Sequence, residues 1–410
     1  MFSKLLRTIE HTKSIDTVKP DLIGSMPSTP SQQLNISILI LNTPCNGFGD
    51  IVFAVKLKRY IDQWFPFATT RIATTKVNAF ISLGESRDIL ISLESVSKVG
   101  DCRRFKTLKP SEPFRERFDL IFVAPLQADF NSSIYDVRYL IPYADEYNTY
   151  FFSEYNDSLR KSFDFHTGIG YGRDGMLFVD TSTITSTILT DKRLVKNNYA
   201  LCYIAETIDH ADLCYRSFLE LVCKKYEQPI FSIIVQEWII NDISSSTINK
   251  LHTHFSTIIT VTKDGEYTYK KSNAKNNNTL YLRGDIYPAP YNEMIVLMKN
   301  SVNDILLTGD QSITDALSCC PRKNIWYQIA PWKQEFAKQL SNHMPQPFYK
   351  NKRTSCGTLR GLSIRSDFRT FVKKWDFRRL ARKRLTKIVN LSVLRRYDPK
   401  VKSLLQTVNQ

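Results

Sequence analysis

The apolar run Asn35–Asn42 (NISILILN) constrains the fold more than any other stretch of this chain. A continuous apolar run of strand length, without polar alternation, fits a parallel sheet that is covered on both faces. A glycine-containing turn follows, and then a helical pattern with Val52, Val55 and Ile61 on one side. The sequence therefore predicts a strand, a tight turn and a helix at the start of an α/β sheet.

A second unit of the same kind lies near the other end of the chain, at Asn303–Ser318 (NDILLTGDQSITDALS). Ile305–Leu307 is typical of a short buried strand, a tight polar turn surrounds Gly309, and a helical period starts at Ile313. A strand that ends in such a turn and opens a helix presents unpaired backbone N–H groups and the positive end of the helix dipole. This turn is therefore predicted to bind phosphate or pyrophosphate without a metal.

The side chains of this second turn add to the prediction. Asp310 can accept a hydrogen bond from a ribose hydroxyl, while Gln311 and Ser312 offer donors to phosphate oxygens. The alternative is that Thr308, Asp310 or Ser312 only caps the helix. On this stretch alone the capping interpretation is favoured, and binding depends on whether another part of the chain complements the turn.

Strand-like and helical patterns alternate along residues 35–345, which predicts two consecutive Rossmann-like α/β domains facing across a cleft. The further strand candidates lie at 71–75, 89–92, 118–124, 149–154, 199–205, 229–235, 257–261, 279–283 and 324–328. The polar segment 263–278 is predicted to be an exposed loop. The expected organisation is a flexible segment at 1–34, a first domain at 35–190, a second domain at 191–345 and a basic helical tail at 346–410.

Composition supports a globular, intracellular chain. The 410 residues are 42% hydrophobic, and they exceed what one ordinary core holds. The eight cysteines include no Cys-x-x-Cys pair, which favours free thiols in a reducing compartment. The N-terminus lacks the apolar core of a signal peptide, and no apolar run reaches membrane-spanning length. We expect the chain in the cytoplasm, of a host cell if its source is a virus or a secreted effector.

The positive charge of the chain is concentrated in its tail. Residues 351–400 hold 16 Lys and Arg against 3 Asp, a net +13, whereas the whole chain is +16. Aromatic and aliphatic residues are interleaved with these charges over Ser363–Leu394, in a helical pattern. Three interpretations of the tail compete: it packs on the body, it lies on an anionic membrane surface as a peripheral attachment, or it binds nucleic acid. Packing together with attraction to a membrane or an acidic partner is favoured. Nucleic acid is the least favoured partner because no recognised binding motif is present.

The most glycine-dense stretch is Phe165–Asp180. As a dinucleotide-binding fingerprint it is weak, because no convincing helix follows its glycines. It is instead predicted to be a flexible loop that lines the cleft with Gly168 and Gly170 and faces the cleft with His166. The alternative for His166 is an ordinary surface histidine or one whose hydrogen bonds are satisfied.

Two short motifs carry a resemblance to known families. The sequence NGFGD at 46–50, followed by a helix, resembles the N-terminal turn of protein-arginine rhamnosyltransferases and ADP-heptose glycosyltransferases. The sequence GDQS at 309–312 resembles their C-terminal donor-binding turn, although the arginine rhamnosyltransferases carry Glu before Asp there. Together with the order of the two α/β halves, these motifs make the chain similar to GT-B glycosyltransferases.

This resemblance implies an inverting transfer of a sugar from a nucleotide-diphosphate donor to an acceptor hydroxyl or amide-type nitrogen. Asp50 is the expected base, with a helix N-cap as its alternative. The residues expected to contact substrate beside it are Asn46, Gly47, Phe48 and Gly49. Gly309, Asp310, Gln311 and Ser312 are expected to hold the donor. Arg283 is expected to neutralise its charge, unless it is a solvated strand end, and Tyr287 to pack on the base or ribose.

Neither a metal nor a cofactor besides the donor is expected, because no Asp-x-Asp stands where metal-dependent GT-A enzymes carry it. Two other classes of function stay open. One is a non-enzymatic α/β scaffold that attaches to an anionic membrane surface or RNA through the tail. The other is a different two-domain sugar-nucleotide enzyme, such as an epimerase. A pair of phosphate-competent turns facing one cleft favours the transferase.

Overall fold

The computed structural model describes residues 35–44, 48–95, 105–126, 133–182, 184, 198–271, 277–349, 363–364 and 367–397. The contacts of the chain divide it into two units, Met1–Asn35 and Ile36–Gln410, and all the elements below belong to the second unit. The predicted flexible segment at 1–34 lies outside the described residues, as do Asn46 and Gly47 of the first turn.

The first sheet is built from six strands in the order β4-β3-β2-β1-β5-β6. Its strands are β1 Ile36–Asn42, β2 Ala68–Thr74, β3 Leu90–Ser95, β4 Leu108–Pro110, β5 Leu120–Leu126 and β6 Thr149–Ser153. Only the edge strand β4 is antiparallel to its neighbour. The connecting helices are α2 Gly49–Trp64, α3 Val77–Ser82, α4 Ile134–Arg138 and the 3₁₀ turns η3 Arg87–Ile89 and η4 Phe105–Thr107. The chain first winds outward through β2 and β3 and then returns to the other side of β1, as in Rossmann folds.

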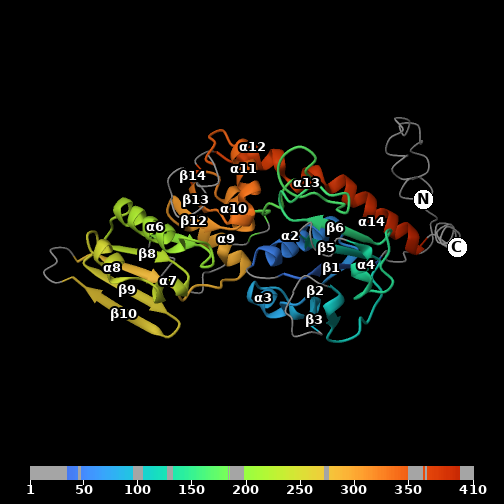
Figure 1. Ribbon diagram of the computed structural model, residues 1–410, viewed down its shortest axis with the longest axis horizontal. Coiled ribbons are helices and arrows are strands. Elements are labelled where there is room, and N and C mark those ends of the chain that lie inside the picture. Colours follow the sequence, from blue (N-terminus) through green and yellow to red (C-terminus); the bar gives the residue numbers. More distant parts are fainter. Residues whose placement is uncertain are drawn as a thin grey trace. The chain divides into compact units, whose positions relative to one another are not determined.

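The second sheet has eight strands in the order β10-β9-β11-β8-β7-β12-β13-β14, with β10 and β14 antiparallel to their neighbours. Its strands are β7 Tyr199–Tyr203, β8 Ile230–Ile234, β9 Thr257–Thr262, β10 Gly265–Lys270, β11 Thr279–Arg283, β12 Asp304–Thr308, β13 Asn324–Gln328 and β14 Ser363–Ile364. Its helices are α6 Ala211–Lys225, α7 Glu237–Asn241, α8 Ser245–Leu251, α9 Tyr291–Asn300, α10 Asp310–Cys319, η5 Pro331–Lys333 and α11 Gln334–Asn342. The predicted fold class, two Rossmann-like α/β halves, is confirmed (Figure 1).

One prediction about this half is wrong. The segment 263–278 was expected to be an exposed loop, but Gly265–Lys270 forms β10, which pairs with β9 in a tight antiparallel hairpin. The strand is largely exposed, and its Tyr267 and Tyr269 rings contact each other at 4.6 Å between centroids. An edge strand buries little of its surface, so it can be polar throughout. The polar composition of this segment therefore gave no strand pattern.

Buried apolar side chains join the two halves. Along β1 the side chains alternate between faces: Ile38 and Ile40 pack toward α2, while Leu39 packs in a separate cluster on the opposite face. The cluster on the α2 side also contains residues of the second sheet, such as Ile305 and Leu307. The two sheets therefore share a continuous hydrophobic core, which fixes α2 of the first half against α10 of the second.

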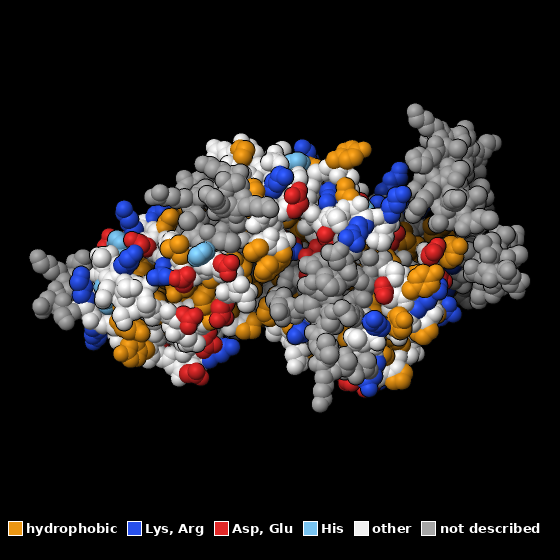
Figure 2. Space-filling view, viewed as in Figure 1, with side chains coloured by type: hydrophobic (Ala, Val, Ile, Leu, Met, Phe, Trp, Pro, Cys, Tyr) orange, Lys and Arg blue, Asp and Glu red, His pale blue; other side chains and the backbone are white. Residues whose placement is uncertain are grey.

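The basic tail packs on the body through three helices. It forms α12 Arg369–Trp375, α13 Phe377–Leu380 and α14 Arg382–Tyr397, and α14 runs along the first sheet (Figure 1). Leu385 and Val389 of α14 are fully buried in the shared core. Arg384 pairs with Asp174 at 2.8 Å. On the face seen in Figure 2, basic and acidic side chains are interspersed. No helix among the described residues is long and apolar enough to cross a membrane.

Buried tyrosines predict a loss of stability at alkaline pH. Burial raises the pKa of Tyr60, Tyr287 and Tyr291 well above the usual value for the phenol. The folded chain then keeps these protons above pH ~10, where the unfolded chain releases them, so stability falls as pH rises past that value. We expect the melting temperature to decline above about pH 10. A melting temperature that stays level between about pH 9 and pH 11 would contradict this.

Candidate active site

A cavity of about 720 Å³ lies at the carboxyl ends of the strands of both sheets. The first half lines it with Phe48, Gly49 and Asp50, which follow β1, and with Glu154, which follows β6. The second half lines it with residues that follow β7, β8, β12 and β13. Both β1 and the pair β7/β12 stand where the winding of their sheets reverses, the position at which open α/β sheets bind ligands.

The structure brings the two glycine turns together across this cavity. A Cβ placed on Gly49 would lie 3.7 Å from Oδ1 of Asp310, so the first turn of α2 touches the first turn of α10. The turn after β1 is tied to its own sheet by Asn42, whose Nδ2 donates to the backbone oxygens of Asp50 at 3.1 Å and Ala124 at 2.9 Å. Asp50 itself lies in the first turn of α2, half-buried, at the cavity wall.

The N-terminus of α10 opens into the cavity without a side-chain cap. The N-cap is Gly309, whose φ of 75° and ψ of 155° fall in a region that only glycine adopts readily. Nothing lies within 4 Å of the place where a Cβ on Gly309 would stand, so the turn is open on that side. The capping alternative for Thr308, Asp310 and Ser312 is therefore wrong. Neither does Asp50 cap α2, because its N-cap is Phe48.

Lys333, which follows β13, joins the two turns at the cavity wall. Its Nζ lies 2.6 Å from Oε2 of Glu154 in the first half and 2.8 Å from Oδ2 of Asp310 in the second. Burial disfavours the charged form of Lys333, but the two carboxylates outweigh it and hold the pKa of the ammonium well above its usual value. Asp310 is thus paired, and its side chain is nearly buried.

Gln311 has a different role from the one predicted. Its side chain was expected to donate to a phosphate, but Oε1 accepts a 3.0 Å hydrogen bond from the buried ammonium of Lys56 on α2. The side chain of Gln311 therefore belongs to the contact between the halves. Gln311 and Ser312 both line the cavity, but Ser312 is only partly buried.

Two glutamines make the loop after β7 rigid. The Ala205 backbone N–H donates to Oε1 of Gln328 at 2.8 Å, and Nε2 of Gln328 donates back to the Ala205 oxygen at 3.1 Å. Gln236 exchanges the same pair of bonds with Ile204. Two side chains thus replace the strand pairing that ends at Tyr203, and this cavity wall is preorganised.

The aromatic wall of the cavity contains Tyr287, for which a base or ribose contact stays a prediction. Its ring meets that of Tyr203 at 5.4 Å between centroids and 64° between planes, and both rings line the cavity. Arg283, in contrast, is not at the cavity wall. It is 3% exposed and forms two 2.7 Å bonds with Asp285, so the prediction that it neutralises a ligand's charge is wrong.

The glycine-rich loop is also placed differently from the prediction. A Cβ on Gly168 would come within 2.6 Å of the Asn156 backbone, and one on Gly170 would contact Gln339, so these glycines allow close packing away from the cavity. Met176 of the same loop pairs with backbone of the tail. His166 does not line the cavity, and burial together with nearby Arg173 lowers the pKa of its imidazole.

Three residues of the site were missed or left without a role. Glu154 and Lys333 both follow parallel strands, so the rule that placed Asp50 could also have placed them. Lys56 interrupts the apolar face of α2, and a charged residue within such a face indicates a buried partner. That partner, Asp315, is far away in the sequence.

Among the charged side chains at the cavity wall, acidic ones predominate. Of the described residues at the wall, six carry a carboxyl group, and Lys333 is the one lysine or arginine. The carboxylates are Asp50, Glu154, Glu206, Glu237, Asp310 and Asp315. An anionic ligand in this cavity would therefore depend on the α10 N-terminus and Lys333, while the remaining wall suits hydrogen-bond donors or cations.

Comparisons with known proteins give only remote likeness. Two solved structures of the E. coli heptosyltransferase WaaC are similar to this chain. The first, with ADP-2-deoxy-2-fluoro heptose, has a TM-score of 0.35 and 10% identity and covers 83% of this chain and 99% of its own. The second, with ADP, has a TM-score of 0.33 and 10% identity and covers 66% of this chain and 81% of its own. No protein-family model and no curated protein matches. At this level of similarity the function has to be inferred from the site itself.

Proposed function

We propose that this chain is a glycosyltransferase that moves a sugar from a nucleotide-diphosphate donor to an acceptor. The observation that carries the proposal is the open N-terminus of α10, which faces a cavity with Asp50 on the other half of its wall. A helix N-terminus with a glycine turn suits a diphosphate, and a carboxylate nearby suits a general base.

The donor would lie against the second half. Its diphosphate would accept hydrogen bonds from the backbone N–H groups of Gln311 and Ser312 and from the Ser312 hydroxyl. The ammonium of Lys333, held in place by Glu154 and Asp310, offsets part of the negative charge of these two carboxylates beside the turn. It has three N–H donors, so one is left to donate to a phosphate oxygen. The Tyr203 and Tyr287 rings would pack on the nucleoside.

Asp50 would act on the acceptor from the first half. Its carboxylate takes the proton of the acceptor hydroxyl or nitrogen as that atom forms a bond to the sugar's anomeric carbon. The bond from this carbon to the phosphate oxygen breaks, and the diphosphate leaves with the electron pair, stabilised by the α10 N-terminus. Base and leaving group on different walls suit attack from opposite sides of the sugar, so we propose inversion. The acidic wall favours an acceptor rich in hydrogen-bond donors.

The reaction is proposed to need no divalent metal, because the helix end and Lys333 can stabilise the leaving diphosphate. Among the described residues, no three acidic, histidine or cysteine side chains are grouped as metal ligands. The experiment that tests donor binding also tests this point. It is a thermal-shift screen with UDP, GDP, ADP, dTDP and CMP, first in EDTA and then with magnesium or manganese.

We expect one nucleoside diphosphate to raise the melting temperature in EDTA. A ligand present at about 100 times its Kd stabilises the folded state by about 2.7 kcal/mol. A shift that appears only with a divalent ion would contradict metal independence. If none of the nucleotides produces a shift under either condition, the proposed donor site is wrong.

A second candidate function is that of a scaffold attached to an anionic membrane surface. It is favoured by exposed basic side chains on the tail helices, among them Lys373, Lys374, Arg379, Lys383 and Lys387. Binding of this kind weakens steeply with salt, because exposed charges are screened. Sedimentation with anionic and neutral vesicles at low and high salt measures it. Binding of RNA, the less favoured partner, is measured at the same low and high salt concentrations.

A further inference from the structure

A buried polar bridge connects the two halves behind the cavity. Nζ of Lys56, on α2, lies 2.5 Å from Oδ1 of Asp315 and 3.0 Å from Oε1 of Gln311, both on α10. The Tyr291 hydroxyl, from the start of α9, donates to the same oxygen of Asp315 at 3.0 Å. Lys56 and Asp315 are 2% and 3% exposed. The bridge therefore consists of directional bonds between buried groups. If either helix shifted, the charge of Lys56 or Asp315 would be left buried without its partner.

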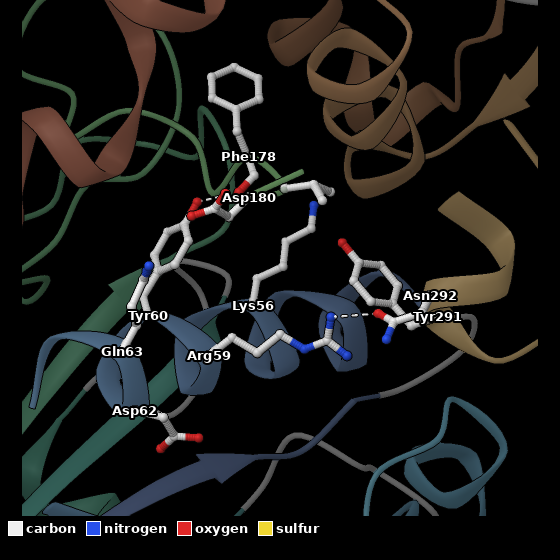
Figure 3. Close-up of a pocket in the computed structure, with 10 residues that line it drawn as sticks. Lys56, Arg59, Tyr60, Asp62, Gln63, Phe178, Asp180, Tyr291 and Asn292 are labelled. Atoms are coloured by element: carbon white, nitrogen blue, oxygen red, sulfur yellow. Dashed lines mark hydrogen bonds between the residues drawn. The ribbon is translucent and has the colours of Figure 1, made fainter. Parts of the chain in front are cut away.

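The surroundings of Lys56 leave this side chain little freedom. Figure 3 shows it rising from α2 between Tyr60 and Tyr291. A second cavity, of about 270 Å³, lies on this side and is lined by Lys56, Arg59 and Tyr291. Asp315 and Tyr291 line the larger cavity. The bridge thus forms part of the partition between the two cavities. Hydrophobic packing alone would not fix the position of α2 along α10.

The residues of the bridge lie on the same two helices as the turns that line the larger cavity. Gln311 is the second residue of α10, whose backbone N–H is proposed to hold the diphosphate. Lys56 is on the same helix as Asp50, less than two turns further along. A bond between these helices sets the position of the base relative to the donor.

We infer that Lys56 is a positioning residue that, through Asp315 and Gln311, couples occupancy of the α10 turn to the helix that carries Asp50. This inference rests on the proposed function, because the ligand at α10 is the nucleoside diphosphate. Rigid helices joined by a directional bond move together, and a misplacement of about 1 Å between base and donor costs up to roughly 10²-fold in rate.

The test uses a variant that removes the bridge without leaving a charge behind. In Lys56→Met/Asp315→Asn, methionine replaces the lysine stem, and asparagine still accepts the bond from Tyr291. Burial lowers the pKa of Lys56 and raises that of Asp315, each opposed by the other's charge, so an uncharged pair is a mild replacement. Lys58→Met is the matched control: it breaks a 2.6 Å Lys–Asp pair on the same helix, but its partner Asp62 is 40% exposed and neither residue contacts α10 through that pair.

The measurement is hydrogen exchange with and without the nucleoside diphosphate identified by the thermal-shift screen, on variants whose cooperative melting shows that they fold. In the wild type and in Lys58→Met, we expect the ligand to slow exchange both at 309–314 and at 53–60, a segment of α2 beyond the cavity wall. In the double variant, protection at 309–314 should persist and ligand-dependent protection at 53–60 should be lost.

The outcomes distinguish a failure of the coupling from a failure of the proposed nucleotide site. Equal ligand-dependent protection of 53–60 in the double variant and the wild type overturns the coupling but leaves the nucleotide site standing. Absence of ligand-dependent protection at 309–314 in the wild type overturns the nucleotide site and the coupling together. A merely structural role for Lys56 would change exchange at 53–60 by the same factor with and without ligand, and that result also overturns the coupling.

Discussion

Replacing Asp50 by asparagine is expected to lower turnover by roughly 10²- to 10⁴-fold, the range that general-base catalysis contributes. Asparagine keeps the size of the side chain but cannot take a proton from the acceptor. Asp50 is in the first turn of α2, on the opposite half from the proposed diphosphate site, so nucleoside diphosphate affinity should stay close to that of the wild type. The measurement is release of nucleoside diphosphate from the donor, together with a thermal shift for binding.

Asp62→Asn is the matched control for this experiment. Asp62 is on the same helix, and its side chain is 40% exposed in a pair with Lys58. It does not line the larger cavity, so its replacement should leave turnover unchanged. Full turnover in Asp50→Asn would exclude Asp50 as the base. A parallel loss of nucleotide binding would mean that Asp50 instead holds the donor.

The sequence was a good guide to the scaffold of this site. Continuous apolar runs such as Asn35–Asn42 are specific for covered parallel strands, and the β1 strand spans Ile36–Asn42. The turn around Gly309 was recognisable because a strand, a glycine and a helix follow one another directly in the chain. Features that depend on neighbouring residues were therefore predictable, and so was the edge of the sheet at which the turns meet.

Side-chain partners were less predictable because they depend on tertiary packing. Lys56 and Gln311 are 255 residues apart, and no local sequence pattern around either residue predicts the contact between them. His166 was expected at the cleft, but its loop is held by backbone pairing between Met176 and the tail, which a local pattern cannot show. Arg283 is a different case: Asp285, two residues away, is a local partner that the sequence displays.

The second large effect is expected at Gly309. Alanine there would be strained, because its φ of 75° with ψ of 155° lies in a region reserved for glycine, at a cost of about 1–3 kcal/mol. Relief of that strain would turn the first N–H groups of α10 away from the cavity. We therefore expect nucleoside diphosphate affinity to fall by about tenfold or more, since each 1.4 kcal/mol is a factor of ten.

Gly265→Ala is the matched control for Gly309→Ala. Gly265 also has a positive φ, 148°, and open space at its Cβ position, but it starts the edge strand β10 and does not line the cavity. The replacement should lower the stability of the fold without lowering the affinity for the nucleoside diphosphate. The comparison therefore separates backbone strain as such from strain at the ligand site.

Calorimetric titration of the wild type, Gly309→Ala and Gly265→Ala with the nucleoside diphosphate chosen by the screen, in EDTA, tests the central claim most directly. If the α10 N-terminus holds the diphosphate, the wild type and Gly265→Ala bind alike and Gly309→Ala binds at least about tenfold more weakly. Equal affinity in all three proteins would place the nucleotide elsewhere, and no heat of binding in the wild type would contradict the donor site itself.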